Sequence, residues 1–364
     1  MNAMRKRLLA AALAVALAAA TGACSPSAAP ADGEPGRGEP FARTRADLLG
    51  TLVTISIYDG GLDDAALAAI ADRCFLEAEA VEARMSANRA DSELSALNRA
   101  AGGGFFEASG ELFGVVARAV EISGMSGGAF DVSIGPVMEL WKEDGAFARL
   151  PSERDTGLLL PLVGYKGIEL RPPGGIRLAE RGMALDLGGI AKGYACDRAL
   201  AVLSGSGVKH AILDFGGNVY ALGTRPDDSP WRVGIRVPLA GESGVVCSVE
   251  ASDASVVTSG GYERFFERGG ELYHHLLDPA TGRPARSGLL SATVIAESSM
   301  DADALSTACF VLGPEKALRL LEESGREGVL IGEDFSIRAT EGLAGAIRVT
   351  DGRFSLAPPD PLRP

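Results

Sequence analysis

The sequence predicts an α+β fold with mixed, mainly antiparallel sheets and packed helices. Apolar residues recur at helical spacing in the first third of the chain, whereas the alternation typical of strands dominates from Ile168 onward. Helical stretches interrupt these later strands in only three places. A doubly wound parallel sheet would need strands and helices to alternate regularly, so the order of the elements argues against that fold class.

The elements are expected in the following order. Residues 51–58 alternate as a strand, residues 62–85 and 110–122 have the apolar spacing of helices, and residues 91–93 resemble a capped helix start. The later strands are expected over residues 168–171, 176–179, 183–187, 210–215, 231–237, 245–251, 255–258, 272–277 and 291–296, followed by three short strands near the C-terminus. The later helices are expected over residues 190–203, 299–312 and 315–324.

The N-terminal residues have the pattern of a lipoprotein signal peptide. Basic residues 5–7 precede the apolar run 8–20, which is too short to cross a bilayer, since a spanning helix needs roughly 20 residues. Small residues then lead to Cys24, as in a bacterial lipobox. We therefore expect residues 1–23 to be removed and a lipid on Cys24 to anchor the protein to a membrane. Simple secretion, with Cys24 unmodified, is the alternative.

The composition of the rest of the chain predicts its domain boundaries and excludes several kinds of ligand. Residues 24–42 are rich in Pro, Gly, Ala and Ser and are expected to form a flexible tether, followed by the folded domain over residues 43–355. The net charge of −13, with no stripe of Lys and Arg, argues against nucleic acid as a partner. Three histidines and no CxxC pair leave no room for a zinc cluster. The remaining cysteines are expected to be buried thiols, not disulfides; they are Cys74, Cys196, Cys247 and Cys309.

Two familiar motif classes do not explain the chain. There is no GxGxxG, and Gly193 is followed by Tyr194, so the Lys-Ser/Thr pair of a P-loop is absent. Residues 124–128 match the GxSxG pattern of serine hydrolases. That motif needs a strand before it, whereas a helical pattern precedes it here, so a serine hydrolase is a minor alternative.

The segment 184–193 predicts a site for an anion. A strand is expected to run into Gly188 and Gly189 and then into a helix with Lys192 in its first turn. Free amides at a helix start and the helix dipole attract phosphate, and Lys192 adds a positive charge. A plain strand–helix turn with a surface lysine is the alternative.

Two further features contain candidate site residues. Asp303 and Thr307 are four residues apart and therefore share one face of a helix. A carboxylate and a hydroxyl are hard ligands suited to Mg²⁺, although an Asp near a helix start also serves as a cap alone. His274 and His275 are adjacent on an expected strand and point to opposite faces, so at most one of them is expected to face a site.

Six segments of the chain, in a fixed order, carry a resemblance to a known family. They are residues 50–55, 85–98, 129–136, 186–193, 275–279 and 302–308. Together they resemble the ApbE family, the FAD:protein FMN transferases. The resemblance implies an ApbE-like fold with the FAD site in a central cleft. It also implies a Mg²⁺-dependent reaction, in which a Thr or Ser hydroxyl of a target flavoprotein attacks the FMN-side phosphorus of FAD and releases AMP.

The resemblance also implies roles for individual residues. The backbone carbonyl of Gly189 and the side chains of Asp303 and Thr307 would hold Mg²⁺. His275 is the candidate for proton handling. FAD would contact Leu49, Ala129, Phe130, Asp131, Asp186, Lys192 and Leu277, with residues 216–217 and 258–260 lining the same cleft.

Asn88 departs from the family's commonest pattern. Many relatives carry an aromatic residue here that stacks on the flavin, which Asn does less well. One alternative activity is therefore hydrolysis of FAD to FMN and AMP, with water as the nucleophile in the same site. A non-enzymatic alternative is a periplasmic lipoprotein that binds and stores FAD. The lipoprotein start fits the resemblance, which implies a lipid-anchored protein on the outer face of a bacterial cell membrane.

Overall fold

The computed structural model describes residues 40–343 and 345–358. The expected signal peptide, the lipobox cysteine Cys24 and most of the expected tether lie outside these residues. In the described part of the chain, none of the helices combines the length and apolarity needed to cross a membrane. The first strand begins at Phe41, so the folded region starts two residues before the expected boundary at residue 43.

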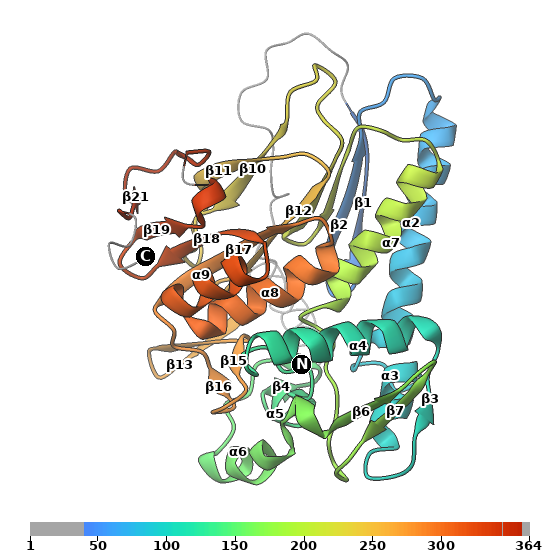
Figure 1. Cartoon of the computed structure of the whole chain (residues 1–364), viewed down its shortest axis with the longest axis vertical. Coiled ribbons are helices and arrows are strands. Elements are labelled where there is room, and N and C mark those ends of the chain that lie inside the picture. Colours follow the sequence, from blue (N-terminus) through green and yellow to red (C-terminus); the bar gives the residue numbers. More distant parts are fainter. Residues whose placement is uncertain (1–39, 344, 359–364) are drawn as a thin grey trace, which may run out of the picture. The chain divides into compact units, whose positions relative to one another are not determined.

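A nine-stranded sheet forms the centre of the fold (Figure 1). Its neighbouring strands are antiparallel, apart from the parallel pair β19 and β21. The expected α+β fold with mainly antiparallel sheet is therefore confirmed. In sheet order the strands are β1 (Phe41–Leu48), β2 (Thr51–Ile57), β8 (Ala211–Phe215), β9 (Asn218–Leu222), β12 (Ala254–Gly260), β17 (Leu289–Ala296), β18 (Glu327–Gly332), β19 (Ser336–Ala339) and β21 (Ser355–Leu356).

The two faces of this sheet are covered differently. Successive side chains of a strand point to opposite faces of the sheet, so neighbouring residues belong to different hydrophobic cores. In β12, Val257 packs under the helices and Val256 packs on the opposite face. The helix layer consists of α2 (Asp64–Met85), α7 (Ala191–Gly205), α8 (Ser299–Leu312) and α9 (Pro314–Glu323). The opposite face packs against a small sheet of β10 (Trp231–Arg236), β11 (Val245–Ala251) and β20 (Arg348–Val349).

The remaining elements lie at one end of the helix layer, below α7 and α8 in Figure 1. The helices there are α3 (Glu93–Arg99), α4 (Gly110–Met125), α5 (Gly135–Leu140) and α6 (Glu153–Leu159), with a small sheet of β3 (Phe106–Glu107), β7 (Gly175–Leu178) and β6 (Ile168–Arg171). Three hairpins join them: β4 (Lys142–Glu143) with β5 (Ala146–Phe147), β13 (Phe265–Arg268) with β14 (Glu271–His274), and β15 (Leu277–Asp278) with β16 (Arg283–Pro284).

The expected strand over residues 183–187 is wrong. Ala184 forms one isolated bridge to Ile134, and the segment joins no sheet. The reason is a side-chain clamp: Asn98 accepts a bond from the Leu185 N–H at 2.8 Å and donates to its carbonyl at 2.9 Å. This amide thus satisfies the backbone groups that a neighbouring strand would otherwise pair.

Other boundaries also differ from expectation. The strand expected over residues 272–277 is split into β14 and β15, and four short strands, not three, follow α9. The edge strand β1 and strand β9 were not expected. In β1, exposed side chains such as Arg43 and Asp47 interrupt the apolar alternation, because an edge strand meets water.

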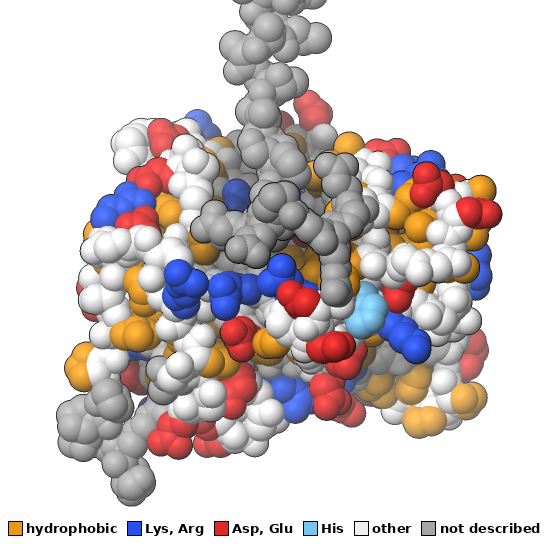
Figure 2. Space-filling view, turned by 90° about the horizontal axis from the view of Figure 1, so that it is seen from above, with side chains coloured by type: hydrophobic (Ala, Val, Ile, Leu, Met, Phe, Trp, Pro, Cys, Tyr) orange, Lys and Arg blue, Asp and Glu red, His pale blue; other side chains and the backbone are white. Residues whose placement is uncertain are grey.

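The side chains that cover the surface carry charges of both signs. On the face drawn in Figure 2, Lys and Arg are interspersed with Asp and Glu, and apolar side chains occur in small groups. Below that surface, Cys74, Cys196, Cys247 and Cys309 are buried and unpaired, which confirms the expectation for these cysteines.

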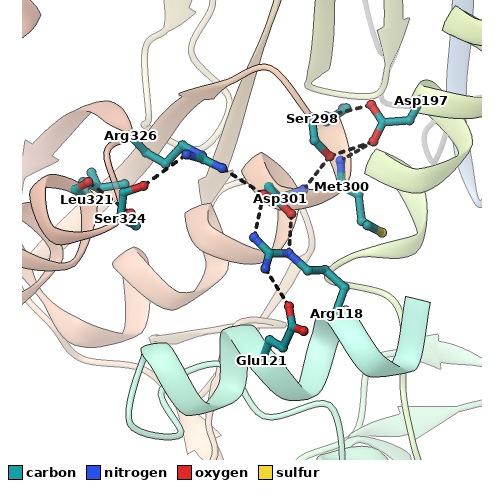
Figure 3. Close-up of polar contacts among 10 residues, drawn as sticks. Arg118, Glu121, Asp197, Ser298, Met300, Asp301, Leu321, Ser324 and Arg326 are labelled. Carbon is teal, nitrogen blue, oxygen red and sulfur yellow. Dashed lines mark hydrogen bonds and ion pairs between the residues drawn. The ribbon is translucent and has the colours of Figure 1, made fainter. Parts of the chain in front are cut away.

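The first turn of α8 is fixed by two carboxylates (Figure 3). Asp197 of α7 accepts bonds from the backbone N–H of Ser299 at 2.8 Å and of Met300 at 3.0 Å. Asp301 makes a two-pronged pair with Arg118 of α4, with both distances 2.7 Å, and lies 3.2 Å from Arg326. Desolvation acts to raise the pKa of Asp301, but the two guanidinium groups hold it below its usual value.

We expect Asp301→Ala to lower the free energy of unfolding by about 3 kcal/mol, because it leaves two converging guanidinium groups without their shared carboxylate. Both arginines are partly exposed, so the loss should lie at the lower end of the range for buried pairs. Urea unfolding of this variant would be compared with that of Asp91→Ala, whose carboxylate is 74% exposed. Equal free energies of unfolding for the two variants would contradict a stabilising role for the Asp301 ion pairs.

The buried His274 should make stability depend on pH. Its Nε2 lies 3.1 Å from the Ala285 carbonyl and its ring edge meets Phe310. Desolvation lowers the pKa of His274 from 6.5 to about 4. The unfolded chain therefore binds one more proton than the folded chain between these pH values, and the free energy of unfolding falls as the pH drops through this window. The slope is about 1.4 kcal/mol per pH unit.

His274→Phe isolates this contribution, because it keeps a ring against Phe310 and removes the titrating group. Urea unfolding between pH 7 and 4 should give a flatter pH dependence for the variant than for the parent. Parallel curves would show that His274 is protonated in the folded state.

Candidate active site

The site lies where the first turns of α7 and α8 touch. A Cβ atom at Gly193 would lie 2.2 Å from the Ser299 carbonyl oxygen, so only glycine allows the two backbones to come this close. The contact brings side chains of α8 to the start of α7. It also brings them to the Gly188-Gly189 turn that precedes α7.

Asp303 of α8 is held by the first turn of α7. Its Oδ2 accepts a bond from the Gly193 backbone N–H at 3.0 Å, and its Oδ1 lies 3.1 Å from the Lys192 Nζ. The Asp303 side chain is 3% exposed. The Gly193 N–H thus binds a carboxylate of the protein and is not free for a phosphate, which corrects the expectation of free amides at this position.

Thr307 lies one turn farther along α8. Its Oγ1 is 3.3 Å from the Ser259 Oγ and donates to the Asp303 carbonyl at 3.4 Å. A Cβ atom at Gly189 would lie 3.4 Å from the same Oγ1. The structure therefore brings together Gly189, Asp303 and Thr307, the three expected metal ligands, and places Ser259 of β12 beside them.

These residues suit Mg²⁺ by the chemistry of their donors. A carbonyl, a hydroxyl and one carboxylate are all hard oxygen ligands, and Mg²⁺ commonly takes few protein oxygens, completing its shell with water and substrate phosphates. Within the described residues no group of three or more His, Cys, Asp or Glu could hold a metal alone. The Lys192 ammonium lies 3.1 Å from the same carboxylate, so Lys192 would compete with a divalent cation for Asp303.

Three of the expected flavin contacts lie around the Gly188-Gly189 turn. Asp186 Oδ1 accepts a bond from the Gly188 N–H at 2.8 Å, and Lys192 Nζ donates to the Gly188 carbonyl at 3.3 Å. The Phe130 ring lies against Gly189, where a Cβ atom would be 3.2 Å away. Phe130 is only 5% exposed, so its ring leaves little surface on which a flavin could stack.

Three of the expected flavin contacts serve the fold itself. The Asp131 carboxylate accepts bonds from the Ser133 N–H and hydroxyl and from the Tyr165 N–H, at 2.6 to 2.9 Å. Leu277 is buried in a small apolar cluster with Trp141. Ala129 is half-buried beside Phe130.

The Leu49 turn and His275 are linked through Arg264. Leu49 and Gly50 both have positive φ, at 54° and 65°, and the Gly50 carbonyl accepts a bond from Arg264 Nη2 at 3.1 Å. The Arg264 carbonyl accepts the His275 N–H at 3.1 Å and lies 3.2 Å from His275 Nδ1. Arg264 therefore links the turn to the histidine, a connection that its position shortly after residues 258–260 could have suggested.

His275 is neutral at physiological pH. Desolvation, then the charge of Arg264, lowers its pKa to about 3. Because Nδ1 faces a carbonyl oxygen, it carries the proton, and Nε2 is left with a lone pair. Nε2 is thus able to accept a hydrogen bond from a hydroxyl group.

Asn88 lies in the loop before α3 and is exposed. Its Oδ1 accepts a bond from the Lys142 Nζ at 2.8 Å, and the same ammonium is 4.0 Å from Asp186 Oδ2. The structure therefore connects Asn88 to Asp186 through a lysine that sequence reasoning missed. No spacing rule links residues 54 positions apart, so this contact could not be predicted from the sequence.

The other expected features take the following places. Gly216 and Gly217 follow β8, where the Gly217 N–H donates to Asp214 at 3.1 Å and the Gly217 carbonyl accepts a bond from the Thr258 N–H at 3.4 Å. Ser126 of the GxSxG match caps the end of α4 and accepts the Phe130 N–H at 3.1 Å. Because α4 precedes Ser126 where a nucleophile elbow needs a strand, the serine hydrolase reading is wrong.

Comparison with known proteins identifies the family of this chain. The ApbE family model matches residues 49–330. The FAD:protein FMN transferase of Treponema pallidum is 38% identical over 88% of this chain and 93% of its own. The protein of the same name from Klebsiella pneumoniae is 35% identical over 76% of this chain and 84% of its own.

Solved structures give the same result for the fold. The ApbE protein of Thermotoga maritima superposes with a TM-score of 0.76 at 30% identity, covering 84% of this chain and 98% of its own. The flavinyl transferase ApbE of Pseudomonas stutzeri, in its apo form, gives 0.73 at 29% identity, over 85% and 97%. The chain therefore belongs to the ApbE family.

Proposed function

We propose that this protein transfers FMN from FAD to a Thr or Ser hydroxyl of a target flavoprotein subunit, in a Mg²⁺-dependent reaction that releases AMP. The observation that carries this proposal is the convergence of Gly189, Asp303 and Thr307 beside Lys192. The similar proteins of Treponema pallidum and Klebsiella pneumoniae, both named FAD:protein FMN transferase, support it.

In the proposed reaction, the acceptor oxygen bonds to the FMN-side phosphorus of FAD. The bond from that phosphorus to the bridging oxygen breaks, and AMP leaves with this oxygen. Gly189, Asp303 and Thr307 would hold Mg²⁺, which when bound neutralises charge on the diphosphate. Lys192, once free of Asp303, would bind a phosphate oxygen as a point charge.

His275 is assigned to the acceptor hydroxyl. Its neutral imidazole offers the Nε2 lone pair, while the Arg264 carbonyl fixes the ring through Nδ1. A pKa of about 3 makes His275 a weak base. We therefore infer that it orients the hydroxyl and accepts its proton only as the new bond to phosphorus forms.

Hydrolysis of FAD by water is the second candidate, and the exposed Asn88 favours it. A small polar side chain leaves this part of the site open to solvent, where an aromatic ring would cover the flavin. Both reactions release AMP. They differ in whether FMN appears on a protein or in solution.

The cellular setting is part of the proposal. We propose that a lipid on Cys24 anchors the protein to the outer face of a bacterial cell membrane, where FAD and the acceptor subunit would meet it. Labelling with a radioactive fatty acid, compared between the parent and Cys24→Ser, tests this anchor. Equal labelling of the two proteins would contradict it.

Incubation with FAD, Mg²⁺ and a candidate flavoprotein subunit tests the proposed function. We expect the intact mass of the subunit to rise by one FMN group, together with release of AMP. AMP without a mass change on any acceptor would identify hydrolysis, and FAD binding without AMP would identify a binding protein.

We expect Asp303→Asn and Thr307→Val each to reduce Mg²⁺-dependent AMP release by at least about a hundredfold, because charge stabilisation by the metal contributes several kcal/mol. Asp72→Asn, which alters a carboxylate 56% exposed on α2, serves as the matched control. Parent-like turnover of either site variant at modest Mg²⁺ would refute the metal assignment.

Lys192→Met should change two constants in opposite directions. Loss of the ammonium weakens FAD binding, since a phosphate loses its positive partner. The same loss lowers the Mg²⁺ concentration needed for half-maximal rate, because the metal no longer competes with Lys192 for Asp303. Titrations of FAD and of Mg²⁺ measure both, and an unchanged Mg²⁺ requirement would mean that the ion pair does not oppose the metal.

A further inference from the structure

We propose that Lys142 is a specificity-determining residue for the flavin end of the substrate and acts together with Asn88. This inference rests on the proposed function, because it assumes that FAD is the ligand of this site. It assigns Lys142 to recognition of the isoalloxazine ring, whose carbonyl oxygens accept hydrogen bonds.

The positive charge of Lys142 is only partly neutralised by acidic side chains of the protein. Its side chain is 12% exposed, yet its ion-pair partners are weak. Glu139, at 3.2 Å, is 73% exposed and largely screened by water, and Asp186 lies at the outer limit of 4.0 Å. The shortest contact is the one to the neutral amide of Asn88, at 2.8 Å. Since an ammonium has three donors, a lysine with such partners can also donate to a further acceptor.

The backbone of Lys142 is held rigidly. The preceding Trp141 is fully buried, and its indole N–H donates to the Gly282 carbonyl at 2.9 Å. Lys142 opens β4 and pairs with Phe147 of β5, whose ring stacks on Trp141 at 5.4 Å. The ammonium is thus presented from a fixed hairpin, which is what precise recognition of a ligand needs.

The bond from Lys142 also fixes the orientation of Asn88. Because Oδ1 accepts from the ammonium, the amide NH₂ of Asn88 points away from Lys142. Lys142 and Asn88 then form one donor surface, with the Asp186 carboxylate beside it. Such a surface matches the carbonyl edge of a flavin and does not depend on the diphosphate or on adenine.

Binding of three ligands to Lys142→Met tests this inference, because methionine keeps the apolar stem and removes the charge. FAD and FMN contain the isoalloxazine ring, whereas ADP has a diphosphate and adenine without it. We expect the Kd values of FAD and FMN to rise about tenfold and that of ADP to stay unchanged, as for loss of a charged hydrogen bond. Lys316→Met, an exposed lysine on α9, is the matched control.

Two further measurements separate recognition from a structural role. Lys142→Arg, which keeps a cationic donor, should restore part of the FAD affinity, and the unfolding temperature of Lys142→Met should match that of the parent. In a double-mutant cycle with Asn88→Ala, the second substitution should add little to the first, because the two residues act as a unit.

The outcomes are distinct. Equal weakening of FAD, FMN and ADP, or unchanged affinity for all three, would overturn the assignment of Lys142, as would full additivity with Asn88→Ala. If the parent protein binds FAD but neither transfers FMN nor releases AMP, the proposed function fails while the ligand comparison still decides the role of Lys142. Absence of FAD binding by the parent would overturn both.

Discussion

The site depends on the close approach of two helix starts. Gly193 of α7 lies against the backbone of Ser299, and Asp303 of α8 reaches back to accept the Gly193 N–H at 3.0 Å. A side chain at residue 193 would push α8 away and remove that bond. One contact between backbones therefore sets the distance between the Gly188-Gly189 turn and the oxygen ligands of α8.

Hydrogen bonds and ion pairs of two further carboxylates hold α8 in this position. Asp197 of α7 caps α8, while Asp301 ties α8 to α4 through Arg118. Burial raises the pKa of Asp197, whereas the arginines keep that of Asp301 low. Asp197, Asp301 and Asp303 thus have different roles at the start of α8: the first two fix the helix, and the third binds Lys192 and the Gly193 N–H of α7. This division explains why so acidic a helix turn is stable.

The sequence was sufficient for features that depend on local spacing. Asp303 and Thr307 share a helix face because they are four residues apart, and the Gly-Gly turn before Lys192 follows from the order of residues. Contacts across the fold were not accessible in this way. The Asn98 clamp that replaces a strand at Leu185, and the Lys142–Asn88 bond, both depend on how distant loops pack, which periodicity does not encode.

The local charge of the site differs from that of the whole protein. The chain carries a net charge of −13, yet Lys192, Arg264 and Lys142 all lie at the expected flavin site. Asp303 faces Lys192 there, and Asp186 lies within reach of Lys142. In the proposed function, a divalent cation at this site would compensate the charge of Asp303 and release Lys192, so the site would then attract an anion. Metal binding and binding of a diphosphate should therefore be coupled: each favours the arrangement that the other needs.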